Sequence, residues 1–246
     1  MGFIKTLKRK SLKFSNLFSK KLNIKNKKII ITGSNSGIGF AITKELVKNN
    51  TLLCLVNKNY DNLKILREKS FEIIQHDFKE SKIDNHILDK IKNFSSNIFI
   101  NCAGDFGSSD QDINSINIQK YQEILNINFF SPLRILMQIF KSHSLEQIVN
   151  ISSEMGSMTL NTNGGYYYYR GSKALVNSLS KNMSIDLKSM KINVFCIHPG
   201  SVKTKMNSGG VISPEFSAQK IINIISENNS KSSGKLIDIN QKVLEW

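Results

Sequence analysis

The sequence predicts a doubly wound α/β fold, in which helices cover both faces of one parallel sheet. Short apolar segments rich in Ile, Leu and Val alternate along the chain with longer amphipathic segments. Apolar strands of this kind are typical of parallel sheets that are buried on both faces. Glycine or polar motifs follow several of these segments, which is where such sheets bind ligands. The length of 246 residues fits a single domain of this type.

The elements follow in order. Strands are expected at Lys28–Thr32, Thr51–Val56, Phe71–Gln75, 97–100, Gln147–Ile151, 191–197 and 236–239. Helices are expected at 40–49, 83–94, 117–141, 169–188 and 214–226. Pro132 is expected to kink the long helical stretch 117–141, because proline cannot supply the backbone N–H that a helix interior needs.

Gly33, Gly37 and Gly39 lie between the first strand and the first helix. Glycines let the backbone turn tightly and approach a ligand, and free N–H groups at the start of a helix favour a pyrophosphate. This strand–turn–helix arrangement predicts a dinucleotide site.

The residues after the strand Thr51–Val56 bear on the choice of cofactor. A site that selects NAD usually has Asp or Glu there, to hold the ribose diol. This chain has Asn57, Lys58 and Asn59, and Lys58 could meet a 2′-phosphate. NADP is therefore favoured over NAD. The alternative is that Lys58 is a solvated loop lysine.

Tyr169 and Lys173 stand four residues apart and share one face of a helix. An ammonium group beside a phenol favours the phenolate and lowers the tyrosine pKa from about 10 toward neutral pH. Such a tyrosine can exchange a proton with an alcohol or a carbonyl. Ser153, after the strand Gln147–Ile151, could hold the same oxygen. The alternative is a tyrosine-rich helix face that packs on the core. Tyr166 and Arg170 have the same spacing, which leaves a question of register.

The net charge of +15 is unevenly distributed. Residues 1–28 carry ten Lys or Arg and no acidic residue, which leaves 24 basic and 19 acidic residues in the remainder. The overall charge therefore does not indicate nucleic-acid binding. Residues 1–26 are expected to form an extension. As a basic amphipathic helix it would contact an anionic membrane surface; a disordered tail or an uncleaved leader are the alternatives.

Cysteines and histidines are dispersed along the chain. Cys54, Cys102 and Cys196 lie in apolar segments without metal-ligand spacing and are expected to be reduced thiols of a cytoplasmic protein. The four histidines are also scattered, so no metal site is expected.

From Lys27 to Trp246 the chain resembles the short-chain dehydrogenase/reductase family. The motifs that carry the resemblance are Thr32-Gly33-x-x-x-Gly37-Ile38-Gly39, Asn101-Cys102-Ala103-Gly104, Asn128, Ser153, Tyr169-x-x-x-Lys173 and Pro199-Gly200-x-x-x-Thr204. Residues 152–157, Tyr169-Arg170-x-Ser172-Lys173 and His198-Pro199-Gly200 are similar to the C-factor-like and sniffer-like carbonyl reductases. The resemblance implies one Rossmann-type domain over residues 27–246.

The resemblance also implies roles for single residues. Tyr169 would be the general acid in carbonyl reduction, Lys173 would lower its pKa and hold the nicotinamide ribose, Ser153 would hold the reacting oxygen, and Asn128 would position a water. The residues expected to bind the cofactor are Gly33, Ser36, Gly37, Ile38, Gly39, Lys58, Asp77, Asn101, Ala103, Gly104, Tyr169, Lys173, Pro199, Gly200, Val202 and Thr204.

Three positions depart from the family pattern. Cys102 stands where the family usually has Asn, Ser153 lies farther from Tyr169 than usual, and Lys205 stands where the subgroup often has Asp. Cys102 removes no catalytic group, and the carbonyl reductase subgroup shares the longer loop before Tyr169.

The expected function is NADP-linked reduction of a small-molecule carbonyl, or oxidation of the alcohol, by a homodimer or homotetramer built on the helix of Tyr169. A dinucleotide-binding signalling protein without catalysis is the alternative, and a membrane-associated enzyme of lipid or polysaccharide assembly is a third reading.

Overall fold

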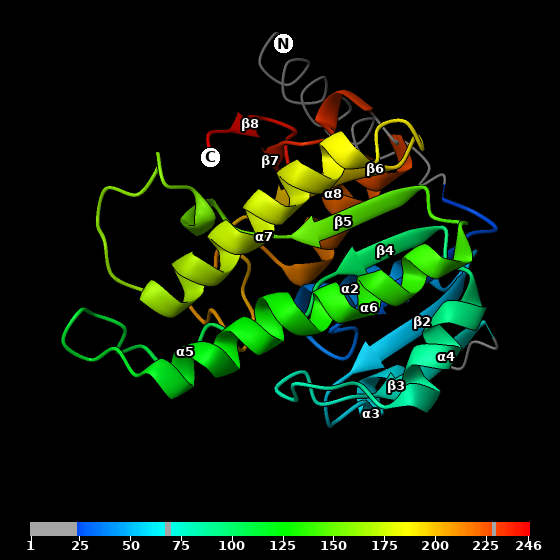
Figure 1. Cartoon of the computed structure of the whole chain (residues 1–246), viewed down its shortest axis with the longest axis horizontal. Coiled ribbons are helices and arrows are strands. Elements are labelled where there is room, and N and C mark those ends of the chain that lie inside the picture. Colours follow the sequence, from blue (N-terminus) through cyan, green and yellow to red (C-terminus); the bar gives the residue numbers. More distant parts are fainter. Residues whose placement is uncertain (1–23, 67–69, 228–229) are drawn as a thin grey trace, which may run out of the picture.

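The computed structural model describes residues 24–66, 70–227 and 230–246, and its centre is an eight-stranded sheet (Figure 1). The strand order is β3-β2-β1-β4-β5-β6-β7-β8. All neighbouring pairs are parallel except β7 and β8, which are antiparallel. The strands are β1 (Lys28–Thr32), β2 (Thr51–Val56), β3 (Phe71–Gln75), β4 (Ile98–Asn101), β5 (Gln147–Ile151), β6 (Asn193–His198), β7 (Leu236–Asp238) and β8 (Val243–Leu244).

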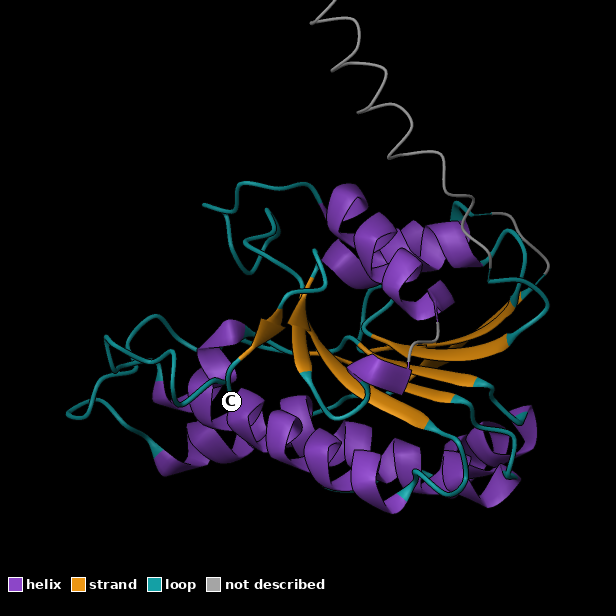
Figure 2. Cartoon of the chain, turned by 90° about the horizontal axis from the view of Figure 1, so that it is seen from above, coloured by secondary structure: helices purple, strands orange, loops and turns teal. Residues whose placement is uncertain are grey.

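Helices cover both faces of the sheet, as Figure 2 shows from above. The helix α2 (Gly37–Leu46) packs against α8 (Pro214–Glu227) on one face. On the other face, α4 (Asn85–Phe94) packs against α6 (Ser131–Ile139), and α5 (Ile118–Leu125) packs against α7 (Tyr167–Asp186). A short helix, α3 (Asp61–Lys64), precedes β3. This confirms the predicted doubly wound α/β fold.

Alternate residues of each strand supply the two halves of the core. Ile29 and Ile31 pack toward α2 and α8, while Ile30 between them packs toward the layer of α4, α6 and α7. All three are fully buried, as expected for a parallel sheet between two helical layers.

The chain leaves β1 in one direction to build β2 and β3, then returns to the other side of β1 to build β4 to β7. The strand order therefore reverses between β1 and β4. In open parallel sheets a crevice forms at the carboxyl ends of the two strands flanking such a reversal, and ligands bind there.

The long helical stretch 117–141 is not one regular α-helix. A π-helical turn, η1 (Asn126–Phe130), separates α5 from α6, and Pro132 lies in the first turn of α6. The N–H of Ser131, the first residue of α6, donates to the carbonyl of Asn126, so hydrogen bonding continues from the π turn into α6. A 3₁₀ turn, η2 (Phe140–Ser142), ends the stretch. The kink at Pro132 stays a prediction.

Other boundaries differ by a few residues. The helix α2 begins at Gly37 and α7 at Tyr167, earlier than the predicted starts at 40 and 169. The strand β8 and the helix α3 were not predicted, because two and four residues carry too little periodicity to be recognised.

Most of the predicted extension 1–26 lies outside the described residues. Ile24, at its end, is buried in the core, and its carbonyl accepts a hydrogen bond from the Asn50 amide at 3.0 Å. The proposed membrane contact of the preceding residues therefore stays a prediction. Within the described ranges, no helix is long and apolar enough to cross a bilayer.

Candidate active site

A cleft of about 830 Å³ lies at the carboxyl edge of the sheet. Most of the residues expected to bind a cofactor line it: Gly33, Ser36, Gly37, Ile38, Gly39, Ala103, Gly104, Tyr169, Lys173, Pro199 and Thr204. The others are the chain neighbours of lining residues: Lys58, Asp77, Asn101, Gly200 and Val202. The chain thus brings segments from residue 33 to residue 204 to one cavity.

The turn between β1 and α2 has no room for side chains at two of its glycines. Gly33 has φ +69°, and a Cβ there would lie 2.8 Å from the backbone of Ala103. A Cβ on Gly39 would lie 2.2 Å from the carbonyl oxygen of Gly33. The Ser36 side chain makes no capping hydrogen bond to the first turn of α2. The first N–H groups of α2 are therefore available to a ligand in the cleft.

Thr32, the last residue of β1, fixes the neighbouring turn after β4. Its hydroxyl oxygen accepts hydrogen bonds from the backbone N–H groups of Cys102 and Ala103, both at 3.0 Å, and the hydroxyl donates to Asn101 Oδ1 at 3.2 Å. The Asn101 amide donates in turn to Asn150 Oδ1 at 3.0 Å. Because the backbone of residue 102 makes the bond to Thr32, cysteine there leaves the turn in place.

The end of β2 carries a cluster of amides. The side chain of Asn35 donates to the carbonyl of Asn59 at 2.5 Å, which ties this loop to the glycine turn. Asn57 and Asn59 line the cleft, and Asn57 Oδ1 is buried without a hydrogen-bond partner among the described residues. Lys58 is exposed. A buried oxygen without a partner in a ligand-sized cleft indicates a place where a ligand would supply the hydrogen.

Tyr169 and Lys173 face the cleft from the first turns of α7. The Lys173 ammonium lies 5.6 Å from the centre of the Tyr169 ring and donates to the carbonyl of Ile151 at 2.9 Å. Burial lowers the pKa of Lys173 to about 8. Burial raises the pKa of Tyr169 to about 12, and the Ser153 hydroxyl beside it acts in the opposite direction. The expected lowering of the tyrosine pKa by Lys173 is therefore not found: desolvation dominates, and the ammonium is directed to a carbonyl.

Asn128 lies in the π turn η1, and 1% of its surface is exposed. Its amide nitrogen donates to the Asp105 carbonyl at 2.9 Å and to Ser172 Oγ at 2.8 Å, while its oxygen accepts from the Asp105 N–H at 2.7 Å. A Cβ on Gly104 would lie 3.6 Å from both the Asn128 oxygen and the Lys173 nitrogen. The π turn thus brings Asn128 close to Lys173. Asn126 instead donates to the carbonyl of Lys79 near the surface.

The other tyrosines of the run have separate places. Tyr168 is buried; its hydroxyl oxygen accepts from the Asn117 N–H at 2.7 Å, and the hydroxyl donates to the Ser115 carbonyl at 3.2 Å. Tyr166 precedes α7 with φ +52°, and its ring packs on Phe106. Arg170 donates to the carbonyl of Met155 at 3.4 Å. Of the two Tyr-x-x-x-basic pairs, the pair Tyr169 and Lys173 lines the cleft.

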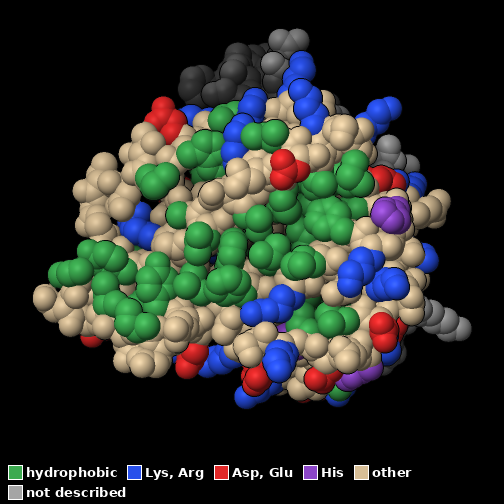
Figure 3. Space-filling view, viewed as in Figure 1, with side chains coloured by type: hydrophobic (Ala, Val, Ile, Leu, Met, Phe, Trp, Pro, Cys, Tyr) green, Lys and Arg blue, Asp and Glu red, His purple; other side chains and the backbone are tan. Residues whose placement is uncertain are grey.

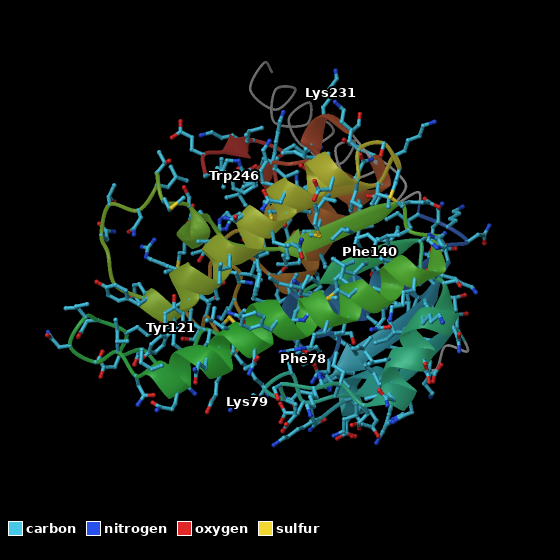
Figure 4. The ribbon with its side chains drawn as sticks, in the orientation of Figure 1. Phe78, Lys79, Tyr121, Phe140, Lys231 and Trp246 are labelled. Atoms are coloured by element: carbon cyan, nitrogen blue, oxygen red, sulfur yellow. The ribbon has the colours of Figure 1, made fainter. Side chains whose placement is uncertain are left out.

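Glycine also sets the distance between α7 and its neighbours. A Cβ on Gly171 would lie 1.8 Å from the hydroxyl oxygen of Tyr121 on α5 (Figure 4 labels Tyr121). A Cβ on Gly156 would lie 2.7 Å from the backbone of Lys173. The close packing at Gly171 holds α7 against α5, and that at Gly156 holds α7 against the segment that carries Ser153.

The loop between β5 and α7 has one anchor near its middle. The backbone N–H of Thr159 donates to the carbonyl of Trp246 at 3.0 Å, and its hydroxyl donates to the same oxygen at 2.7 Å. Trp246 packs beside Val176 and Leu236 (Figure 4). His198 Nδ1 accepts from the Glu154 N–H at 3.2 Å, and burial lowers its pKa. His198 therefore holds the start of this loop.

Several lining residues were not among the predicted ones: Asn35, Phe78, Lys79, Asp105, Lys203 and Lys205. Most lie one or two positions from a predicted residue. Their position near the end of a strand could therefore have identified them. Asp105 contacts Asn128 through its backbone, and no side-chain pattern reports such a contact.

Comparison with known proteins gives a family. The model of the family described as short chain dehydrogenase matches residues 27–211. C-signal of Myxococcus xanthus is 32% identical over 124 residues, which cover 49% of this chain and 75% of that protein. An uncharacterized oxidoreductase of Staphylococcus epidermidis is 27% identical over 194 residues, which cover 76% of this chain and 82% of that protein.

Solved structures share the fold. The carbonyl reductase Sniffer of D. melanogaster has a TM-score of 0.80 at 24% identity, with 90% of this chain and 100% of that chain covered. An NADPH-bound carbonyl reductase from chicken fatty liver has a TM-score of 0.78 at 22% identity, with 91% and 100% covered. Because the family model spans most of the chain, the protein belongs to the short-chain dehydrogenase family and is an NAD(P)-dependent oxidoreductase.

Proposed function

We propose that the protein reduces a small-molecule carbonyl with NADPH, or oxidises the corresponding alcohol, with Tyr169 as the proton donor. The observation that carries the proposal is that two segments line the same cleft: the glycine turn before α2 on one side, and Tyr169 and Lys173 on the other. The carbonyl reductase titles of two structures with the same fold support this reaction class.

The residues present fit a dinucleotide. At Gly33 and Gly39 a Cβ would collide with backbone atoms of Ala103 and Gly33, so glycine at both positions lets the turn close, and the first N–H groups of α2 suit a pyrophosphate. Asn57 Oδ1, which has no hydrogen-bond partner in the described part of the chain, lies where the adenosine ribose would be held. The nicotinamide supplies the hydride chemistry when bound. Lys173 would hold its ribose, and Gly104 and Thr204 would lie along it.

A preference for NADP rests on the missing carboxylate at the end of β2. The cleft wall there presents Asn57 and Asn59, and neither amide would repel a 2′-phosphate as Asp or Glu would. Lys58 is exposed one residue away and can approach that phosphate. NADP-bound relatives of the same fold support the preference.

The chain's own residues would manage the proton. Because burial keeps Tyr169 protonated at neutral pH, its hydroxyl can donate to the oxygen of a carbonyl that accepts a hydride. Ser153 would hold that oxygen, and Asn128 and Lys173 would return a proton to the phenolate through a water.

The experiment titrates the protein with NADPH and NADH, followed by nicotinamide fluorescence, and then measures NADPH oxidation against a panel of aldehydes and ketones. We expect tighter binding of NADPH and turnover of at least one carbonyl. A protein that binds dinucleotide but turns over none of the panel would favour the alternative, a non-catalytic dinucleotide-binding signalling protein.

We also propose self-association through the helical face shown in Figure 3, where apolar side chains gather over α5, α6 and α7. Its exposed members include Ile118, Phe130, Met137 and Leu175. Contiguous apolar surface of this kind marks interaction sites, and the family resemblance favours a second copy of the chain. Light scattering of Met137→Glu/Leu175→Glu should give a smaller particle than the unmodified protein.

A further inference from the structure

The wall of the cleft opposite the glycine turn carries two lysines that the reaction does not use. Lys203 and Lys205 both line the cleft, on either side of Thr204. Thr204 lies directly over the start of α2, because a Cβ on Gly37 would be 3.3 Å from Thr204 Cγ2. The two lysines therefore extend from the segment that faces the N-terminus of α2.

The backbone that carries these lysines is braced. The N–H of Lys203 donates to the Ile212 carbonyl at 2.9 Å, and Val202 and Ile212 form an isolated parallel bridge. The N–H groups of Thr204 and Asn207 bond to each other's carbonyls at 3.1 and 3.2 Å. A Cβ on Gly210 would lie 2.3 Å from the backbone of Lys203. The loop is thus closely packed on itself, and the lysines start from fixed positions.

Other charges of the cleft wall already have partners. Lys79 lies 3.2 Å from the Glu123 carboxylate, and the Asp61 carboxylate lies 2.9 Å from Lys64. The Lys173 ammonium is directed to the carbonyl of Ile151.

Asp105, also in the wall, accepts from the N–H of Gly107 at 2.9 Å. Among the described residues, no carboxylate forms an ion pair with Lys203 or Lys205. The cleft therefore presents two ammonium groups opposite a helix N-terminus, and both features favour an anion.

We propose that Lys203 and Lys205 bind the pyrophosphate of the dinucleotide from the loop side, so that it lies between two ammonium groups and the N–H groups of α2. The proposal rests on the proposed function, which supplies the dinucleotide. The pyrophosphate is the anionic group that NAD and NADP share. The lysines would therefore add affinity for both and would not discriminate between them.

The test compares Lys203→Gln/Lys205→Gln with a control that removes the same charge elsewhere, Lys44→Gln/Lys188→Gln. Lys44 lies near the end of α2 and Lys188 just after the end of α7, both exposed. Dissociation constants for NADPH and NADH are measured by nicotinamide fluorescence at low and high salt. Relative to the control, we expect binding of both dinucleotides to weaken by about 2- to 30-fold at low salt, and the difference to shrink at high salt.

Three results would overturn the proposal. If Lys203→Gln/Lys205→Gln bound both dinucleotides as tightly as the control does, a contact between these lysines and the cofactor would be excluded. Weaker binding of NADPH alone would assign the lysines to the 2′-phosphate. Unchanged cofactor binding with a raised KM confined to carbonyls that bear a carboxylate would assign them to the substrate. Failure of the unmodified protein to bind either dinucleotide would instead contradict the proposed function itself, and this inference with it.

Discussion

The glycine turn between β1 and α2 meets the cleft with backbone, whereas the segment from β5 to α7 meets it with side chains. At Gly33 and Gly39 an added Cβ would collide with neighbouring backbone. On the other side of the cleft, Tyr169 and Lys173 contribute the side chains that we propose for catalysis. Adding atoms to the glycine turn should therefore impair folding and dinucleotide binding. Removing functional groups from Tyr169 or Lys173 should instead impair turnover.

The largest effect is expected from Tyr169→Phe. Loss of the proposed proton donor should lower kcat by about 10²- to 10⁴-fold, while NADPH affinity changes little because the ring stays in place. The assay is steady-state carbonyl reduction, with NADPH titration alongside. Tyr166→Phe is the matched control, since its ring packs on the same Phe106. If Tyr166→Phe lowered kcat more than Tyr169→Phe does, Tyr166 would replace Tyr169 as the proposed proton donor.

Lys173→Met should be inactive yet more stable at neutral pH. Burial lowers the pKa of Lys173 from 10.5 to about 8. Below pH 8 the lysine is charged in both states, so the folded protein bears the full cost of burial. Between about 8 and 10.5 only the unfolded chain keeps the proton, and the unmodified protein becomes more stable as pH rises.

The gain in unfolding free energy from Lys173→Met should thus reach at most about 3 kcal/mol near neutrality and shrink toward pH 10.5. Urea unfolding without dinucleotide, at several pH values, measures it. Lys181→Met, an exposed position on the same helix, is the control. A gain that does not depend on pH would show that the buried charge is not its source.

Gly39→Ala tests the glycine turn between β1 and α2. Its Cβ would lie 2.2 Å from the Gly33 carbonyl oxygen, so the turn must open, at a cost of about 1–3 kcal/mol in unfolding free energy. Dinucleotide binding should weaken as well, because the turn holds the start of α2. Gly209→Ala should leave both quantities unchanged, since a Cβ there meets its nearest neighbour at 3.9 Å.

The smallest effect is expected where α5 meets α7. Gly171→Ala should destabilise the protein by about 1 kcal/mol, because its Cβ would overlap the Tyr121 hydroxyl. In a Tyr121→Phe background the same change should cost less, because the nearest remaining atom, Cζ of the ring, lies 3.0 Å away and alanine favours a helix more than glycine does. A double-mutant cycle by urea unfolding measures the difference, and an equal cost in both backgrounds would contradict the overlap.

The sequence was informative where a single local property decides the outcome. Apolar runs such as Thr51–Val56 became strands with the predicted bounds, and motifs at strand ends met at one cleft because parallel strands share that edge. The catalytic roles of Tyr169, Lys173, Ser153 and Asn128 stay predictions.

What the sequence missed depends on packing. The π turn that directs Asn128 inward has no pattern of its own. The direction of the Tyr169 pKa shift depends on how deeply the fold buries the phenol, which spacing along a helix does not report. The bracing of Lys203 and Lys205 likewise depends on contacts with Ile212 and Gly210.

The anchor of Thr159 on the carbonyl of Trp246 has a practical consequence for redesign. It divides the span between β5 and α7 into a tethered part beside Ser153 and a stretch over residues 160–165. A Cβ on Gly164 or Gly165 meets no atom within 4 Å. Insertions within residues 160–165 should therefore be tolerated, because they leave Ser153 and the start of α7 in place.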